Sequence, residues 1–343
     1  MALLDVVAAA SAARDLVVAK APGRRSAEGI VHTPAGLARF VAREADAALR
    51  EQLGLPLGLA DGRVAIIDPS VGTGAFLAAA FELAAGRRSR PAACMGHDLD
   101  AAALEACEGA LGAAFAERGW PLALERVDTL GLEGESPGEV AVVIGNPPWA
   151  ARSGTSERVK SDRLLADFRR DESGAPLGER KIGVLSDDYV RFFRWGAEVV
   201  RRAPGGGVLA LVTNGSFLDG PVHRAMRASL LKWFARVDVI DLGGSALVAR
   251  EAGADAIRDE NVFAVRPKVA VTVASRPAGH GELLPSATVH YARLRGPRGE
   301  KLDRLGEPLA TGALEVTPPL YVFAPGSGAR FPASAIPLPD LFP

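Results

Sequence analysis

The four-residue run Asn146-Pro147-Pro148-Trp149 is the feature of this sequence that most directly suggests chemistry. Two successive prolines fix their backbone φ angles and remove two N–H donors. The Asn146 side-chain carbonyl and the Pro147 backbone carbonyl are then placed to accept both hydrogens of one planar amine. These contacts expose the nitrogen lone pair for in-line attack on a methyl sulfonium. Trp149 would stack on the ring that carries the amine, a contact worth roughly 1–3 kcal/mol. A rigid loop exit beside a buried tryptophan is the structural alternative.

A glycine-rich turn, DPSVGTGAF, covers residues 68–76 and begins with Asp68 and Pro69. Gly72 and Gly74 allow a sharp turn and a close approach of the backbone to a ligand. The helix that follows presents its unpaired N–H groups to that ligand. The turn matches neither the phosphate-binding GxxxxGK[ST] loop nor GxGxxG. It predicts a cofactor-binding loop, with a purely structural strand-to-helix turn as the alternative.

Two carboxylates follow further predicted strands. Asp98 is placed to accept hydrogen bonds from both hydroxyls of a ribose, and Asp128 to accept from an adenine amine. Asp100 is a rival for the ribose, but it better suits the N-cap of the next helix. A solvated strand-end carboxylate is the alternative for either residue. No CxxC or HExxH spacing suggests a metal site.

The elements that position these residues alternate between strand and helix. Short apolar runs that predict strands cover residues 64–68, 92–98, 122–128 and 140–146. Strands that alternate with helices predict a parallel sheet, and such sheets bind ligands at the carboxyl ends of their strands. The four polar residues at those ends are Asp68, Asp98, Asp128 and Asn146.

The rest of the chain is less informative. Helical spacing covers residues 1–20, and Thr33 at an N-cap with Pro34 in the first turn predicts a helix to about Gln52. Further expected elements are a loop at 150–186, a helix at 187–202, strands at 207–213 and 237–242, a helix around 222–234, and a bent strand or hairpin at 261–274. After residue 276 the periodicity fades.

Composition excludes several classes of protein. The 343 residues include 48% hydrophobic and 24% charged residues, which is typical of a globular chain, and the net charge is −1. That charge argues against a purely electrostatic nucleic-acid binder. Two cysteines give no disulfide framework, no apolar run has membrane-spanning length, and charged residues interrupt the N-terminal apolar stretch. We therefore expect a cytoplasmic protein without a membrane anchor.

Taken together and in order, the motifs resemble the N6-adenine DNA methyltransferases. DPSVGTGAF, a strand-end Asp, RVDTL and GNPPW are similar to that family's cofactor and catalytic motifs. VHTPAGLARFV resembles an upstream motif that closes over the methionine carboxylate of the cofactor. Thr33 and Pro34 match it, while His32 replaces a usual tyrosine. The later stretches, SDDYVRFFRWG to ENVFAVRPKVAVTVASR and YARLRGPRGEKLDRL, are most similar to the methyltransferase portion of type ISP and type IIG restriction–modification enzymes.

This resemblance implies a class I S-adenosylmethionine-dependent methyltransferase fold, α/β and Rossmann-like, with a mostly parallel sheet and helices on both faces. It implies S-adenosyl-L-methionine as cofactor, DNA as partner, methylation at N6 of adenine and no metal. By resemblance Phe263 would stack on the extruded base; a core phenylalanine is the alternative. The basic stretch at 293–304 would either contact phosphate or form a solvated face.

The expected organisation is a helical lead-in at 1–30, a catalytic domain at 31–276 and an extension at 277–343. The extension would be the start of a target-recognition region, so the chain looks like part of a longer enzyme with separate nuclease or helicase regions. Two other functions stay open. One is methylation of another planar amine, in protein glutamine or RNA adenine, and the other is a catalytically incomplete cofactor-binding fragment.

Overall fold

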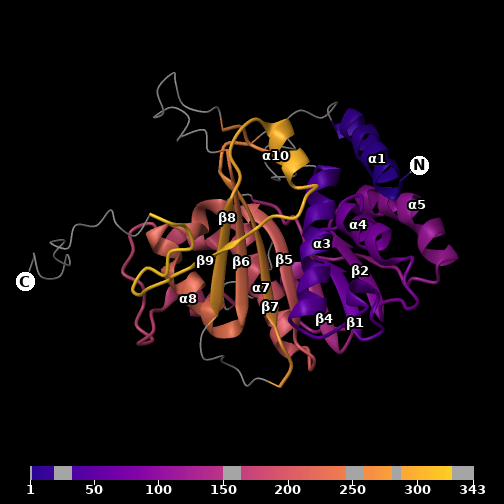
Figure 1. The fold of residues 1–343 in the computed structure, drawn as a ribbon. Helices are drawn as coiled ribbons and strands as arrows, with labels where there is room; N and C mark the ends of the chain where they lie inside the picture. Colours follow the sequence, from indigo (N-terminus) through magenta and orange to yellow (C-terminus); the bar gives the residue numbers. More distant parts are fainter. Residues whose placement is uncertain are drawn as a thin grey trace, which may run out of the picture.

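The computed structural model describes residues 2–18, 33–149, 164–244, 259–263, 265–279 and 287–326. Its centre is a nine-stranded sheet with the order β3-β2-β1-β4-β5-β7-β6-β8-β9 (Figure 1). The strands are β1 (Val64–Asp68), β2 (Ala93–Asp98), β3 (Ala123–Arg126), β4 (Val140–Gly145), β5 (Gly207–Asn214), β6 (Arg236–Gly243), β7 (Val269–Arg276), β8 (Thr288–Arg293) and β9 (Gly312–Leu314). All run in one direction except β7 and β9, which pair antiparallel to their neighbours.

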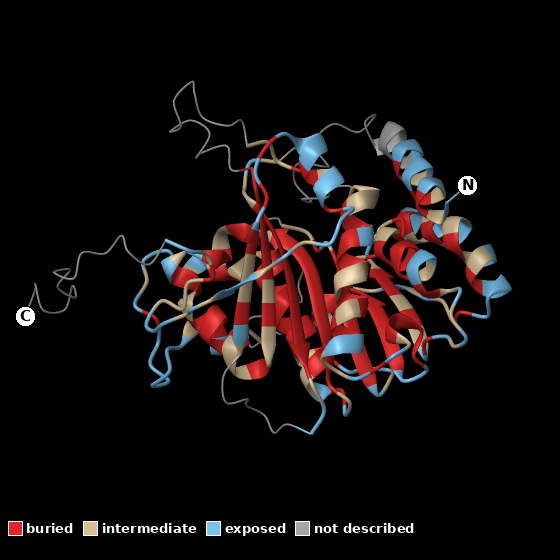
Figure 2. Ribbon diagram, in the orientation of Figure 1, coloured by how far each residue is buried: buried red, intermediate tan, exposed pale blue. Residues whose placement is uncertain are grey.

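Helices cover both faces of this sheet. The described helices are α1 (Leu3–Val18), α3 (Ala35–Glu51), α4 (Ala75–Ala84), α5 (Ala101–Glu117), α7 (Asp188–Arg202), α8 (Arg224–Trp233) and α10 (Arg298–Arg304). The core on one face joins the strands to α1, α3, α4 and α5, and the core on the other joins them to α7 and α8. Central strands are buried along their length (Figure 2), because both faces are covered. The predicted α/β, mostly parallel arrangement is confirmed.

Alternate residues of β4 show how one strand serves both cores. Val142 and Ile144 pack toward α3 and α4, while Ala141 and Val143 pack toward α7. Branched side chains at successive positions suit a strand that is buried on two faces. The continuous apolar run in the sequence therefore reflects the sandwiching of the sheet between helices.

Most expected elements lie within a few residues of their predicted bounds, and two expectations are wrong. Pro34, not Thr33, is the N-cap of α3, and no side chain caps that helix. The strand expected from residue 261 begins only at Val269, because the Asn261 side chain bonds the chain into a bend at Phe263. Residues 150–163 of the expected loop and His32 lie outside the described residues.

The chain after residue 276 holds structure that the sequence pattern missed. β8 pairs with β6 from Arg236↔Thr288 to Asp241↔Arg293 and so continues the same sheet. Helix α10 stands above the upper edge of the sheet in Figure 1. The division of the chain at residue 276 stays a prediction. No helix among the described residues is long and apolar enough to span a membrane.

Candidate active site

The strand order reverses between β1 and β4, and a ligand crevice is expected at such a reversal. From β1 the chain winds toward β2 and β3, and from β4 it winds the other way toward β5. Open α/β sheets bind ligands at the carboxyl ends of the strands where this reversal occurs. β1 ends at Asp68, and Asn146 directly follows β4. A Cβ at Gly145 would lie 2.8 Å from Asp68 Oδ1, so the two strand ends are in close contact.

Asp68 lies completely buried at this crevice. Its Oδ1 accepts a hydrogen bond from the Ser70 amide at 3.1 Å, and its Oδ2 has no partner among the described residues. Burial raises the pKa of Asp68 to about 8, although the Ser70 amide opposes the shift. A nearby carboxylate, Asp98, raises it further. The Ser70 hydroxyl is likewise buried without a partner in the described part of the chain.

Gly72 and Gly74 are required in the loop for different structural reasons. Gly72 has a φ of +53° and faces open space, with nothing within 4 Å of the position a Cβ would take. Gly74 has a φ of +92° and caps α4. A Cβ there would meet Cys107 Sγ and Leu111 Cδ1 at 2.7 Å each. Gly74 therefore allows α5 to pack against the loop, while Gly72 leaves room on the outer side of the loop.

The carboxylate of Asp98 holds the glycine loop in place. Oδ2 accepts from the Gly72 amide and Oδ1 from the Asp100 amide, each at 2.9 Å. A carboxylate has about four acceptor positions, so capacity remains for the hydroxyls of a ligand. Asp100 caps α5 by accepting from the Ala102 amide, as predicted.

Asp128 follows β3, which ends at Arg126, and lies near the same loop. Its side chain caps a short 3-10 turn by accepting from the Leu130 amide. The adjacent Thr129 donates its hydroxyl to the Pro69 carbonyl at 2.7 Å. Sequence reasoning missed Thr129, although its place directly after a strand-end aspartate was a signal. The loop is thus bonded to the carboxyl ends of both β2 and β3.

Asn146 lies within hydrogen-bond reach of an element far away in the sequence. Its Nδ2 donates to Thr33 Oγ1 at 3.2 Å, and Thr33 precedes helix α3. Pro147 is buried, whereas Asn146 and Pro148 are partly exposed. The structure therefore brings the predicted catalytic asparagine together with a residue that was predicted to bind cofactor.

The two predicted aromatic residues also meet. The rings of Trp149 and Phe263 lie edge to face, with centroids 5.3 Å apart and planes at 82°. Trp149 is partly exposed and Phe263 is 3% exposed. In this arrangement Phe263 supports Trp149, and the rings leave no gap for a third ring between them.

A buried lysine fixes the segment that carries Phe263. Lys301 Nζ donates to the carbonyls of Leu242 at 2.6 Å and Glu260 at 2.7 Å, and it pairs with Asp259. Lys301 is 1% exposed, so it belongs to neither a solvated basic face nor a phosphate-binding one. Asn261 then accepts from the Phe263 amide. Sequence reasoning placed Lys301 only within the basic stretch, because its partners are remote in sequence, and it gave Asn261 no role.

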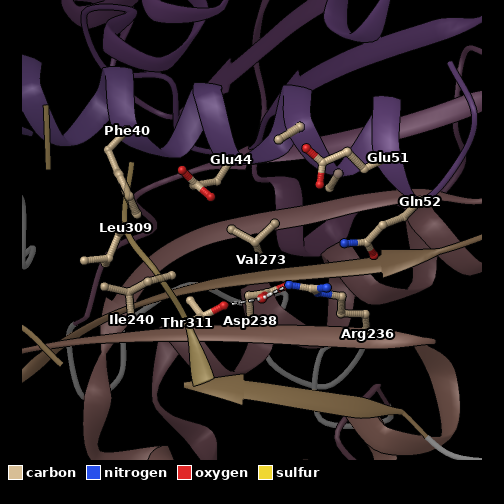
Figure 3. A pocket seen from close by; sticks show the side chains of 12 residues that line it. Phe40, Glu44, Glu51, Gln52, Arg236, Asp238, Ile240, Val273, Leu309 and Thr311 are labelled. Carbon is tan, nitrogen blue, oxygen red and sulfur yellow. Dashed lines mark hydrogen bonds and ion pairs between the residues drawn. The ribbon is translucent and has the colours of Figure 1, made fainter. Parts of the chain in front are cut away.

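Two hollows on the surface contain none of the predicted site residues. One of about 210 Å³ lies between α3 and the strands β6 and β7, where Glu44 and Glu51 extend toward β6 (Figure 3). Arg236 and Asp238 on its floor are already paired with each other. Burial raises the pKa of Glu44, against the opposing effect of Arg43. The second hollow, of about 310 Å³, is lined by Arg293, Arg295 and Arg304 together with Glu300 and Asp303.

The residues at the crevice fit a nucleoside-type cofactor with a polar tail. The fit rests on the two buried side-chain oxygens without partners, Asp68 Oδ2 and Ser70 Oγ, and on the open space beside Gly72. It also rests on acceptor capacity at Asp98. Among the described residues, no cluster of three or more metal-ligating side chains occurs.

Among the comparisons with known proteins, only the comparison of structures finds matches. No protein-family model matches the sequence, and no curated protein matches it. Among solved structures, the ATP-dependent type ISP restriction–modification enzyme LlaBIII bound to DNA matches with a TM-score of 0.66 and 21% identity, over 81% of this chain and 21% of that one. The DrdV–DNA complex matches with a TM-score of 0.69 and 22% identity, over 89% of this chain and 32% of that one. A nuclease-deletion mutant of the type ISP enzyme LlaGI in complex with a DNA substrate mimic matches with a TM-score of 0.66 and 20% identity. The match covers 84% of this chain and 30% of that one.

These matches concern the fold. The predicted class I methyltransferase fold is confirmed, and the structural neighbours are restriction–modification enzymes. This chain spans between a fifth and a third of the length of the three neighbours named above.

Proposed function

We propose that the chain transfers a methyl group from S-adenosylmethionine to N6 of adenine in DNA, as part of a restriction–modification or related defence system in the cytoplasm. One observation carries the proposal. Asn146-Pro147-Pro148-Trp149 directly follows β4 at the reversal of strand order, in contact with the strand that leads into the glycine loop. An amine acceptor and a cofactor loop thus share one crevice.

The cofactor would be held by residues at or just after the ends of β1, β2 and β3 and by Thr33, which precedes α3. The loop from Asp68 and Pro69 to Gly72 and Gly74 would receive its polar tail together with Thr33. Asp98 would accept from the ribose hydroxyls, with acceptor capacity beyond its backbone contacts, and Asp128 would accept from the adenine amine. When bound, S-adenosylmethionine supplies an electrophilic methyl group on a sulfonium.

The chain's own residues act on the target amine. Asn146 Oδ1 and the Pro147 carbonyl accept the two amine hydrogens and hold the nitrogen lone pair toward the methyl group. The amine nitrogen held by these two carbonyls would be the nucleophile for the methyl group that the bound cofactor would supply, and the amine would release one proton to solvent. No positive charge then remains on the methylated base.

The target adenine must leave the duplex, because its amine is otherwise paired and stacked. Trp149, which is partly exposed, offers the stacking face. Phe263 supports that ring from the side and would stack on the base itself only after becoming exposed.

The DNA backbone has a candidate contact surface at the same edge of the sheet. β8 runs parallel to β6, so the hollow lined by Arg293, Arg295 and Arg304 lies where β8 ends. Phosphate contacts by arginine supply sequence-independent affinity. With a net charge of −1, the chain alone should bind duplex DNA weakly, with a steep salt dependence and little sequence preference.

Single-turnover methyl transfer tests the proposal. The protein is mixed with labelled cofactor and mixed-sequence DNA, as duplex and as single strands, and the digested product is analysed by mass spectrometry. We expect N6-methyladenine, formed faster on single strands, where extrusion costs less. Asn146→Ala should keep cofactor binding and lower the rate by at least 10²-fold, a typical loss for one transition-state contact.

The matched control is Asn214→Ala, at the end of the neighbouring strand β5, where the side chain accepts from the Ser216 amide. It should methylate at the parental rate. Methyl transfer to a glutamine amide or to RNA, with none to DNA, would replace the proposed substrate. Cofactor binding without transfer to any of these acceptors would support a catalytically incomplete fragment.

A further inference from the structure

We propose that Thr33 is a positioning residue that fixes which end of the Asn146 carboxamide faces the target amine. The inference rests on the proposed function and deepens it. Its basis is the hydrogen bond from Asn146 Nδ2 to Thr33 Oγ1 at 3.2 Å. The two residues are 113 positions apart in sequence, so the contact exists only because α3 begins where β4 ends.

The Thr33 hydroxyl is free of the role that its position in the sequence suggests. The amides of Leu37 and Ala38 in the first turn of α3 bond to the Pro34 carbonyl, and no side chain caps the helix. Pro34 restricts the residue before it to extended backbone conformations. Thr33 is therefore held by its own backbone, and its hydroxyl oxygen accepts from Asn146.

The direction of this bond determines the chemistry of the asparagine. A carboxamide presents two donors at its nitrogen and an acceptor at its oxygen. With Nδ2 bound to Thr33, Oδ1 is on the opposite side of the group and accepts an amine hydrogen. Turning the carboxamide over would present N–H groups to an N–H donor, and methyl transfer would lose its acceptor. Thr33 favours the productive orientation.

Nuclear magnetic resonance of the cofactor-free protein tests this contact directly. The sequence has only three asparagines, Asn146, Asn214 and Asn261, so selective ¹⁵N-asparagine labelling yields three side-chain amide pairs. Asn146→Ala identifies one of them by its loss. We expect Thr33→Val to shift that pair alone and Thr33→Ser to restore it. An Asn146 pair that is unchanged in Thr33→Val would overturn the proposal.

Kinetics separates positioning from cofactor binding. At saturating cofactor and DNA, Thr33→Val should lower the single-turnover rate roughly three- to tenfold, the effect of one neutral hydrogen bond, and Thr33→Ser should recover it. Thr272→Val removes a fully buried threonine hydroxyl that has no partner among the described residues, and it should methylate normally.

The possible failures are distinguishable. If Thr33→Val weakens cofactor affinity in calorimetry but leaves the saturated rate unchanged, Thr33 serves the cofactor only and the positioning role is wrong. If the unaltered protein forms no methylated product, the proposed function fails. The asparagine spectrum then still decides whether Thr33 orients Asn146.

Discussion

Two segments at the carboxyl edge of the sheet are held by opposite means. The glycine loop at 68–74 is fixed by bonds to neighbouring strand ends, from Gly72 to Asp98 and from Val71 to the His97 carbonyl. The segment at 259–263 is held in part by a buried ammonium group, that of Lys301, which comes from a helix about 40 residues later, and in part by hydrogen bonds to the backbone of Gly244 and Gly296. A strand-end carboxylate holds the first segment, and a buried cation helps to hold the second.

The difference extends to the carboxylates of the two segments. Asp259 is paired with Lys301 and accepts from the Gly244 amide. Asp68 has a buried oxygen without a partner in the described part of the chain. A buried polar group without a partner costs free energy, and such groups concentrate at ligand sites. An unpartnered oxygen at Asp68 is what the proposed cofactor loop requires, whereas Asp259 already has its partners.

Removing the lysine should give the largest effect. Lys301→Met leaves Asp259 without its cation and two carbonyls without their donor. We expect a loss of about 3–5 kcal/mol in the free energy of unfolding, as for a broken buried pair, measured by urea denaturation. The double variant Lys301→Met/Asp259→Asn should recover part of that loss.

The control for this change is Arg304→Met, an exposed basic residue on the same helix, which should stay within about 0.5 kcal/mol of the parent. If Lys301→Met were equally mild, the 259–263 segment would have another support and the contrast between the two segments would disappear.

Removing the aspartate that holds the glycine loop should give a smaller effect, seen mainly in ligand affinity. Asp98→Ala removes an acceptor for the ribose hydroxyls and for the Gly72 amide, so S-adenosylmethionine binding should weaken by about 1–3 kcal/mol in calorimetry. Asp100→Ala, which loses the cap of α5, should bind the cofactor normally. Equal losses in both variants would show that helix capping, and not ribose contact, controls the affinity.

Much of this architecture could be predicted from local sequence. The strand predicted at 64–68 has the same bounds as β1, and Asp100 caps α5 as expected. In both cases the determining contacts lie within a few residues. The strand expected at 261–268 fails because Asn261 bonds to the Gly244 and Pro267 carbonyls, and apolar periodicity cannot register those bonds.

The residues of the candidate site also fall into those that local sequence predicts and those that it does not. The glycine loop and the strand-end carboxylates could be predicted because each follows a strand and faces one edge. Thr33 carried the signature of an N-cap, and its contact with Asn146 depends on a pairing across 113 positions. Lys301 stood in a charged run that indicates a solvated face, and its burial follows from packing against β6. The ends of strands can be recognised from the sequence pattern, whereas contacts between residues distant in sequence cannot.

The pH dependence of the free energy of unfolding tests whether Asp68, unlike the paired Asp259, is buried without a partner. The expected change per pH unit is the smallest of the effects predicted. Burial raises the pKa of Asp68 from 3.8 to about 8, so between those values the folded protein holds a proton that the unfolded chain has released. The free energy of unfolding therefore falls as pH rises through that window, by at most about 1.4 kcal/mol per pH unit. Asp68→Asn cannot titrate and should flatten this slope, while Asp303→Asn, at an exposed position of α10, should keep it. Urea midpoints from pH 5 to pH 8 measure the slopes. Parallel curves for Asp68→Asn and the parent would mean that Asp68 is ionised in the folded protein, and that its second oxygen has a partner after all.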